Sequence, residues 1–152
     1  MIGVYSTVKE LRDELISVGI NTVTFGQISE PDLDKKSLYP LAHITPIGTT
    51  LGEQAAIVRY TVVVLDILDV TNENESIVED ALGNVSNMED ILHQLAVKVN
   101  IVFQRLKARN DVYYIEDETI DLDPILMDYS NRLAGYSFTL NYLVPNGDES
   151  SC

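Results

Sequence analysis

The sequence predicts an α+β domain in which two helices pack on a mixed, mainly antiparallel sheet that contains a long β-hairpin. Three observations lead to this prediction. Two stretches carry apolar residues every three or four positions, which is the spacing of a helix with one buried face. Several β-branched runs bounded by glycine or polar residues are typical of strands. The longest of these runs follows Gly48 and Gly52, which indicate a hairpin turn.

The first helix is indicated by a capping box, Thr7-Val8-Lys9-Glu10, in which a hydroxyl and a carboxylate each accept a hydrogen bond from a free backbone N–H. The helix has one apolar stripe, and Gly19 is suited to end it in a left-handed conformation. The stripe consists of Val4, Val8, Leu11, Leu15 and Val18.

Two strands are expected next. Asn21 to Phe25 is short and β-branched, and the polar stretch Gln27 to Tyr39 is expected to be a surface loop. A second strand begins near Tyr39. Pro40 and Pro46 cannot donate a hydrogen bond to a neighbouring strand, so each predicts an edge position or a bulge.

The longest predicted strand runs from Ala56 to Val70, after a turn at Gly48 to Gly52. Its centre is apolar on both faces, so helices or a neighbouring subunit are expected to cover both. Its length exceeds the usual strand of about five or six residues. We therefore expect it to reach past its own domain.

The second helix is expected to follow a polar loop at residues 71–85 and to begin at another capping box, Ser86-Asn87-Met88-Glu89. Acidic residues stand at its start and basic residues at its end, in agreement with the helix dipole. Its apolar stripe consists of Ile91, Leu92, Leu95, Val99, Val102, Phe103 and Leu106.

The last part of the chain predicts two more strands, Val112 to Ile115 and Leu133 to Val144, joined in part by an acidic connection from Glu116 to Asp123. The second of these strands alternates apolar and polar residues, and Gly135 is expected to mark a bulge at its start. Residues 1–146 are therefore predicted to form a single structural domain, and residues 147–152 a flexible polar tail.

The chain has 24 acidic and 10 basic residues, and its net charge is −14. Proteins that grip nucleic acid or anionic lipid use clustered Lys and Arg, so sequence-specific DNA or RNA binding and membrane binding are not expected. The lone cysteine, Cys152, cannot form a disulfide within the chain and suits a reducing cytoplasm. The N-terminus has no signal-peptide pattern, so we expect synthesis as a soluble cytoplasmic protein.

No catalytic, cofactor-binding or metal-binding residue is predicted, so the chain is expected not to be an enzyme. His43 and His93 have no second ligand at a metal-binding spacing. The acidic residues between Asp117 and Asp123 lack the glycine and closing glutamate of a calcium loop and are expected to form a solvated acidic loop. The stretch Gly48 to Gly52 lacks the lysine of a phosphate-binding loop.

Two segments carry a resemblance to a known family. They are Ile20 to His43 (INTVTFGQISEPDLDKKSLYPLAH) and Arg132 to Asn146 (RLAGYSFTLNYLVPN). They are similar to small structural proteins of tailed bacteriophages, crAss-like phages included, and the order of elements resembles the tail-terminator and tail-completion fold. The resemblance implies a virion protein that forms a ring of six or twelve copies around the DNA channel, at the tail or the head–tail junction. Its implied partners are other tail, portal and connector proteins.

The residues expected at the oligomer interface belong to the hairpin region: Tyr39, His43, Ile47, Leu51, Ile57, Arg59 and Tyr60. The segments Gln27 to Lys36 and Thr71 to Val85 are expected to become ordered on assembly. Two other functions remain open at this stage. An acidic DNA mimic would inhibit a host nucleic-acid-binding enzyme, and a small-ligand-binding or enzymatic domain would have a discrete pocket with convergent polar groups.

Overall fold

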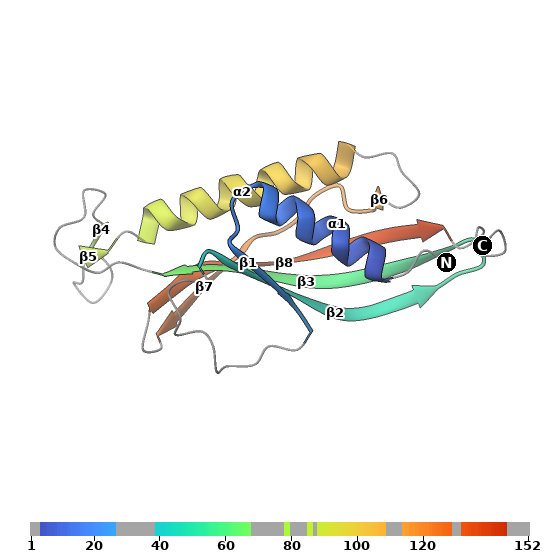
Figure 1. Cartoon of the computed structure of the whole chain (residues 1–152), viewed down its shortest axis with the longest axis horizontal. Helices are drawn as coiled ribbons and strands as arrows, with labels where there is room; N and C mark the ends of the chain where they lie inside the picture. Colours follow the sequence, from blue (N-terminus) through green and yellow to red (C-terminus); the bar gives the residue numbers. More distant parts are fainter. Residues whose placement is uncertain are drawn as a thin grey trace.

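The computed structural model describes residues 4–26, 39–67, 78–79, 85–86, 88–108, 114–128 and 132–145. They form two helices and eight strands, and the predicted α+β class is confirmed. Both helices lie on one face of a mixed, mainly antiparallel sheet (Figure 1). The predicted tail at 147–152 and the segment Gln27 to Lys36 lie outside the described residues.

Helix α1 (Val4–Ser17) starts three residues before the predicted capping box, so the capping prediction is wrong. Thr7 is fully buried and Glu10 is 8% exposed, because both lie inside the helix and not at its start. The predicted apolar stripe is confirmed for Leu11 and Leu15 in the core and for Val8 and Val18 packed against it, whereas the side chain of Val4 lies outside the description. Gly19 has a φ of 99°, so the helix ends in the left-handed conformation that was predicted.

The sheet begins with β1 (Thr22–Phe25), which pairs in parallel with the first four residues of β2 (Leu41–Leu51). Strand β2 then forms an antiparallel hairpin with β3 (Ala55–Ile67). The pairing shifts register between Pro46 and Gly48, so the bulge predicted at Pro46 is confirmed. The hairpin tip is at residues 52–54, later than the predicted turn, because Gly48 belongs to the bulge.

The second layer is dominated by α2 (Met88–Ala108), which buries the predicted stripe against the sheet, with Leu92 only partly buried. It begins where predicted, although Asn87 of the predicted capping box lies outside the described residues. Two short strands, β4 (Val78–Glu79) and β5 (Val85–Ser86), pair with each other within the stretch predicted as a loop. The β-branched Val78 and Val85 suit this pairing.

Strand β8 (Arg132–Pro145) lies in the interior of the sheet, next to β3 on one side. Two strands share its other edge: β6 (Tyr114–Ile115) at one end and β7 (Asp123–Asp128) at the other. Strand β7 was not predicted from the sequence, because Pro124 and the aspartates at both ends are residues that are uncommon in strands. The sheet order is therefore β1-β2-β3-β8, with β6 and β7 beyond β8.

The bulge predicted at Gly135 is absent, because Gly135 pairs regularly with Leu65. A Cβ atom added at Gly135 would lie 1.7 Å from the carbonyl oxygen of Val64. The glycine is therefore required by the close approach of the β3 backbone and not by a change of register.

The apolar centre of β3 is buried on both faces, but helices cover only one. Val62 and Val64 belong to the main core under the helices. Val63 and Leu65 belong to a second, smaller cluster on the opposite face. That cluster also contains Tyr39, Leu41 and Leu133, with Ile67 and Ile125 packed against it.

Candidate functional site

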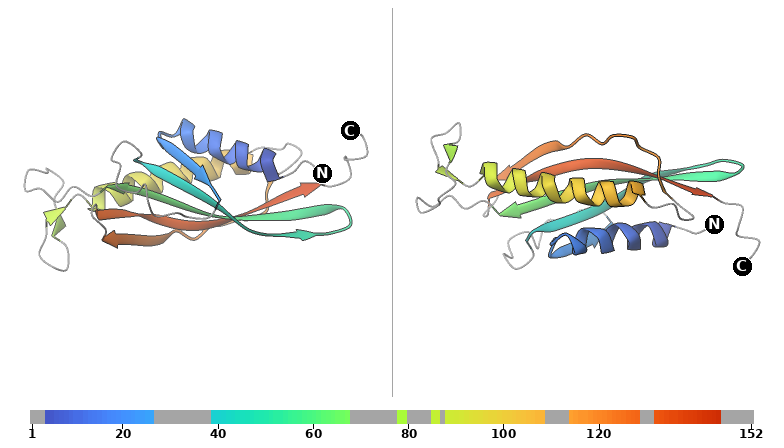
Figure 2. Two further views of the ribbon diagram at one scale, coloured as in Figure 1. Left: turned by 60° about the horizontal axis from the view of Figure 1, so that its bottom comes forward. Right: turned by 90° about the horizontal axis from the view of Figure 1, so that it is seen from above.

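The β2–β3 hairpin extends well past the ends of both helices (Figures 1 and 2). Every residue from 46 to 54 is exposed. Two of them are large apolar side chains: Ile47 is 51% exposed and Leu51 is 73% exposed. The hairpin end therefore presents apolar side chains that no described element of this chain covers.

The bulge in β2 places Ile47 opposite no residue of β3, since Pro46 pairs with Tyr60 and Gly48 pairs with Arg59. Gly48 has a φ of 149°, in the region that favours glycine. Beyond the bulge, the Arg59 guanidinium donates a 2.8 Å hydrogen bond to the Thr50 hydroxyl and ties the two strands together. The hairpin beyond the helices is thus an ordered ladder with an irregular outer strand.

The seven residues expected at the interface do not share one surface. Ile47 and Leu51 are exposed near the hairpin end, and Ile57 and Arg59 are half-buried on the β3 side of the same hairpin. These four lie near the hairpin end, but Leu51 is on the face that carries the helices, whereas Ile57 and Arg59 are on the opposite face. The other three are Tyr39, His43 and Tyr60. Those three are buried inside the protomer and are not available for contact with another protein.

His43 joins β1 to β2. Its ring Nε2–H donates to the Gly26 carbonyl oxygen at 2.7 Å, and its Nδ1 is 2.5 Å from the Thr24 hydroxyl. Because a carbonyl oxygen only accepts, the proton of the neutral ring is on Nε2, and Nδ1 accepts from Thr24. Both ring nitrogens are used within the chain, so His43 has the structural role of holding the short edge strand.

Tyr60 belongs to the core between the sheet and α1. Its hydroxyl shares a 2.5 Å hydrogen bond with Thr7, and its ring meets that of Tyr142 edge-on with centroids 5.9 Å apart. Burial raises the pKa of Tyr60 above its ordinary value of 10.0, although the bond to Thr7 lowers it. Tyr60 therefore fixes α1 on the sheet.

The far edge of β8 contains a polar contact that sequence reasoning missed. The Asp117 carboxylate accepts hydrogen bonds from the backbone N–H of Asn141 at 2.8 Å and from its side-chain Nδ2 at 2.7 Å. The Glu116 N–H donates to the Asn141 carbonyl oxygen at 2.8 Å. The connection predicted as a solvated acidic loop is thus attached to β8 at its start. Only the pairing of β6 with Leu143 and Tyr142 places it there, and the sequence does not reveal that pairing.

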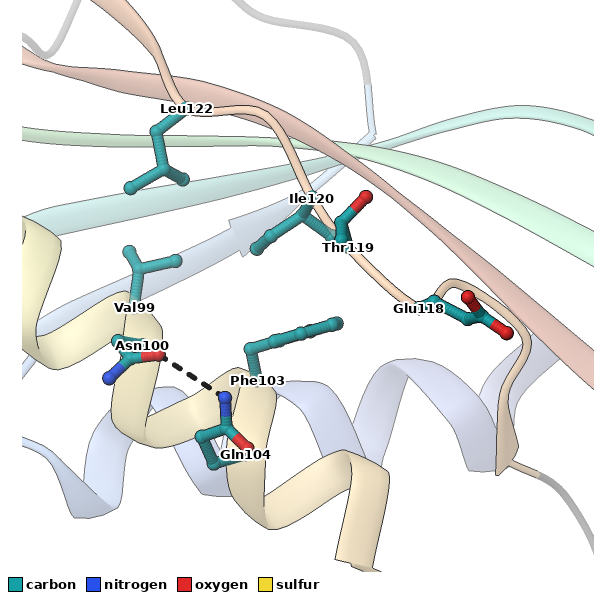
Figure 3. Close-up of a pocket in the computed structure, with 8 residues that line it drawn as sticks. All are labelled: Val99, Asn100, Phe103, Gln104, Glu118, Thr119, Ile120 and Leu122. Atoms are coloured by element: carbon teal, nitrogen blue, oxygen red, sulfur yellow. Dashed lines mark hydrogen bonds between the residues drawn. The ribbon is translucent and has the colours of Figure 1, made fainter.

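A groove lies between α2 and the connection that follows Asp117 (Figure 3). Its volume is about 300 Å³, at the lower end of the range for ligand pockets. Apolar and polar side chains line it in equal number: Val99, Phe103, Ile120 and Leu122, and Asn100, Gln104, Glu118 and Thr119. Glu118 is the one titratable group among these residues, so the groove has no pair of groups for acid–base catalysis.

Asp66 lies on β3, and burial raises the pKa of its carboxyl above the ordinary value of 3.8. A hydrogen bond from the Ile67 N–H and the charge of Lys98 act in the opposite direction. No group of three or more His, Cys, Asp or Glu within the described part of the chain is arranged to hold a metal ion. No helix among the described residues is long and apolar enough to span a membrane.

Within the part of the chain that the structure describes, the hairpin end and the groove both have potential for recognition, and the hairpin end has the larger exposed apolar side chains. A comparison with known proteins found no protein family that matches the chain and no curated protein with significant sequence similarity.

Proposed function

We propose that this chain is a structural protein that assembles into a ring, and that the ring belongs to the tail or the head–tail junction of a tailed bacteriophage. The ring would contain six or twelve copies and contact tail, portal or connector proteins. The phage assignment is supported by the resemblance of the segments 20–43 and 132–146 and by the order of the elements.

One observation carries the assembly proposal: β2 has an unpaired outer edge among the described residues. Strand β1 pairs only with Leu41 to Ile44, so the edge from Thr45 to Leu51 is without a described neighbour. Soluble proteins protect such edges with charged residues, proline or β-bulges. This edge has Pro46 and the bulge at Ile47, but the segment TPIGTTL contains no charged residue and carries the exposed Ile47 and Leu51. An edge of this kind is suited to pairing with another strand.

The acidic composition is compatible with a ring around DNA. A net charge of −14 repels phosphate, so DNA would pass without adhering to the wall. The same charge would also suit an acidic DNA mimic. The mimic needs carboxylates spaced along one face, whereas the hairpin region from Leu41 to Ile57 contains Glu53 as its one acidic residue.

The test is the absolute mass of the purified protein by light scattering at low and high concentration, with negative-stain images of the same fractions. We expect closed rings in the wild-type protein. Ile47→Lys and Leu51→Lys should each reduce the ring fraction at least tenfold, because a charge would be buried at the contact. Ile16→Lys is the matched control, since Ile16 on α1 is also 51% exposed.

Each variant is first checked by circular dichroism, so that loss of rings is not confused with loss of folding. If Ile47→Lys and Leu51→Lys form rings as well as the wild-type protein does, the hairpin end is not part of the interface between copies. A protein that stays monomeric at every concentration and binds a basic nucleic-acid-binding enzyme would refute the ring and support the DNA mimic.

A further inference from the structure

Among the described residues, β2 and β7 have the two longest unpaired strand edges, and the short strands β1 and β6 are also paired on one side only. One of the two longest edges is β2 from Thr45 to Leu51, at the β1 side of the sheet. The other is β7, Asp123–Asp128, at the opposite side. A head-to-tail contact needs two different surfaces on one chain, and two edges on opposite sides of one sheet meet that requirement.

Most of the β8 far edge is occupied. Strand β7 pairs with residues 132–137, and β6 pairs with Tyr142 and Leu143. At Asn141, where neither strand reaches, the Asp117 carboxylate accepts the backbone N–H and the Glu116 N–H donates to the carbonyl oxygen. Because these contacts cover most of the β8 far edge and β6 has only two residues, β7 offers the longest open edge on this side of the sheet.

Each unpaired edge has one highly exposed leucine, and the two leucines point to the same face of the sheet. Leu51 pairs with Ala56, two positions from the core residue Val58. Leu126 pairs with the core residue Ala134. Both side chains are therefore on the face that carries the helices. At 73% and 61%, they are the most exposed large apolar side chains in the described part of the chain.

We propose that the β2 edge of one copy pairs with the β7 edge of the next copy, and that Leu51 packs against Leu126 of that copy. This inference rests on the self-assembly proposed above and names its contact. Strands β2 and β3, β3 and β8, and β8 and β7 are each antiparallel, so β2 and β7 run in opposite directions. When two copies have the same orientation, β2 of one and β7 of the next are therefore antiparallel. Leu51 and Leu126 then lie on the same face of the joined sheet.

The two edges are offset along the strands. Through the pairing with β3, the β2 edge is level with residues 139–144 of β8, whereas β7 is level with residues 132–137. Leu51 is level with Val144 of β8 and Leu126 is level with Ala134, so contact between the two leucines sets an offset of ten residues, or roughly 33 Å at the rise of a strand. Each copy is thus displaced along the strand direction relative to the last, and the strands tilt from the ring axis, as they do in closed barrels.

Disulfide cross-linking tests the contact. All variants contain Cys152→Ser, so that introduced cysteines are the only thiols. The double variant Leu51→Cys, Leu126→Cys should give a ladder of cross-linked copies under mild oxidation. A mixture of the two single variants should stop at a dimer, because each copy then has one cysteine and each link needs one of each kind. Thr49→Cys replaces Leu51→Cys in a second set, since Thr49 is on the same face two residues away.

The outcomes separate this contact from the proposed function. Rings that form without any ladder from either set refute the β2–β7 pairing and leave the ring intact. A dimer from Leu51→Cys alone shows that two β2 edges pair with each other, and it also refutes the proposal. A protein that gives neither rings nor cross-links refutes both. The ladder together with dimers from the mixture supports both.

Discussion

Replacing Asp117 by alanine should destabilise the domain by an amount that the structure allows us to work out. The carboxylate accepts two hydrogen bonds from Asn141, at 2.8 and 2.7 Å. Hydrogen bonds to charged groups contribute about 1.5–3 kcal/mol each. Asp117 is only half-buried, so water replaces part of this energy. We therefore expect Asp117→Ala to cost about 3 kcal/mol.

The assay is thermal and urea unfolding followed by circular dichroism, at concentrations where the protein is monomeric, since assembly would itself raise the transition temperature. For a domain of this size, about 3 kcal/mol corresponds to a fall in Tm of roughly 6–12 °C. Asn141→Ala removes the side-chain bond but keeps the backbone N–H bond, so it should cost roughly half as much. Asp121→Ala, at an exposed position of the same connection, should change the free energy of unfolding by less than about 0.5 kcal/mol.

Equal unfolding temperatures of Asp117→Ala and Asp121→Ala would show that the two hydrogen bonds do not stabilise the fold. A greater cost of Asn141→Ala than of Asp117→Ala would show that the backbone bond contributes nothing. Asp117→Asn separates charge from shape, since the amide can accept one of the two bonds and is nearly the same size.

Four further substitutions test the core and its electrostatics. Gly135→Ala forces a methyl group against the Val64 carbonyl oxygen, and this overpacking should cost about 3 kcal/mol, visible as a lower urea midpoint. Thr7→Val and Tyr60→Phe each remove their shared hydrogen bond, and a double-mutant cycle should give a coupling energy of about 1 kcal/mol. The pKa of Asp66 is raised in the folded state, so its stabilising contribution is fully present below pH 3.8 and is lost as pH rises through the folded-state pKa. Asp66→Asn should therefore increase stability at pH 7, and the increase should shrink as pH falls towards 3.8.

Each of these predictions has a result that contradicts it. Gly135→Ala is compared with Gly48→Ala, where an added Cβ meets no atom within 4 Å and the cost comes from the φ of 149° alone. A greater cost of Gly48→Ala would show that the contact with the Val64 carbonyl is not the larger effect. Additive effects of Thr7→Val and Tyr60→Phe would mean that the bond contributes nothing. If Asp66→Asn lowers the free energy of unfolding by the same amount at every pH, burial is not the main influence on the Asp66 carboxyl.

The sequence was sufficient for the elements whose periodicity is strong. The stripe of α2 is long and unbroken, and each of its predicted core residues packs against the sheet as expected. The bulge at Pro46 was predictable because proline cannot donate to a neighbouring strand. The capping box of α1 was misleading because Thr7 and Glu10 have the right spacing but lie on the buried face of a longer helix.

The candidate interface was predictable only in part. Exposure at the hairpin end follows from strand length, so the exposure of Ile47 and Leu51 could be expected. The burial of Tyr60 depends on a contact with Thr7, 53 residues away, which no local pattern encodes. Strand β7 was missed for a similar reason, since its pairing with β8 and not its composition makes it a strand.

The position of β8 has a consequence for how the chain folds during synthesis. Strand β3 pairs with β8 across sequence separations of about 66 to 90 residues, whereas the β2–β3 hairpin is local. At about 5–20 residues per second, the ribosome would need roughly 3–18 s to deliver β8 after β3 has emerged. During that interval the backbone N–H and C=O groups on one side of β3 have no partner strand. A cell that makes this protein in quantity must keep that strand from pairing with the nascent chain next to it.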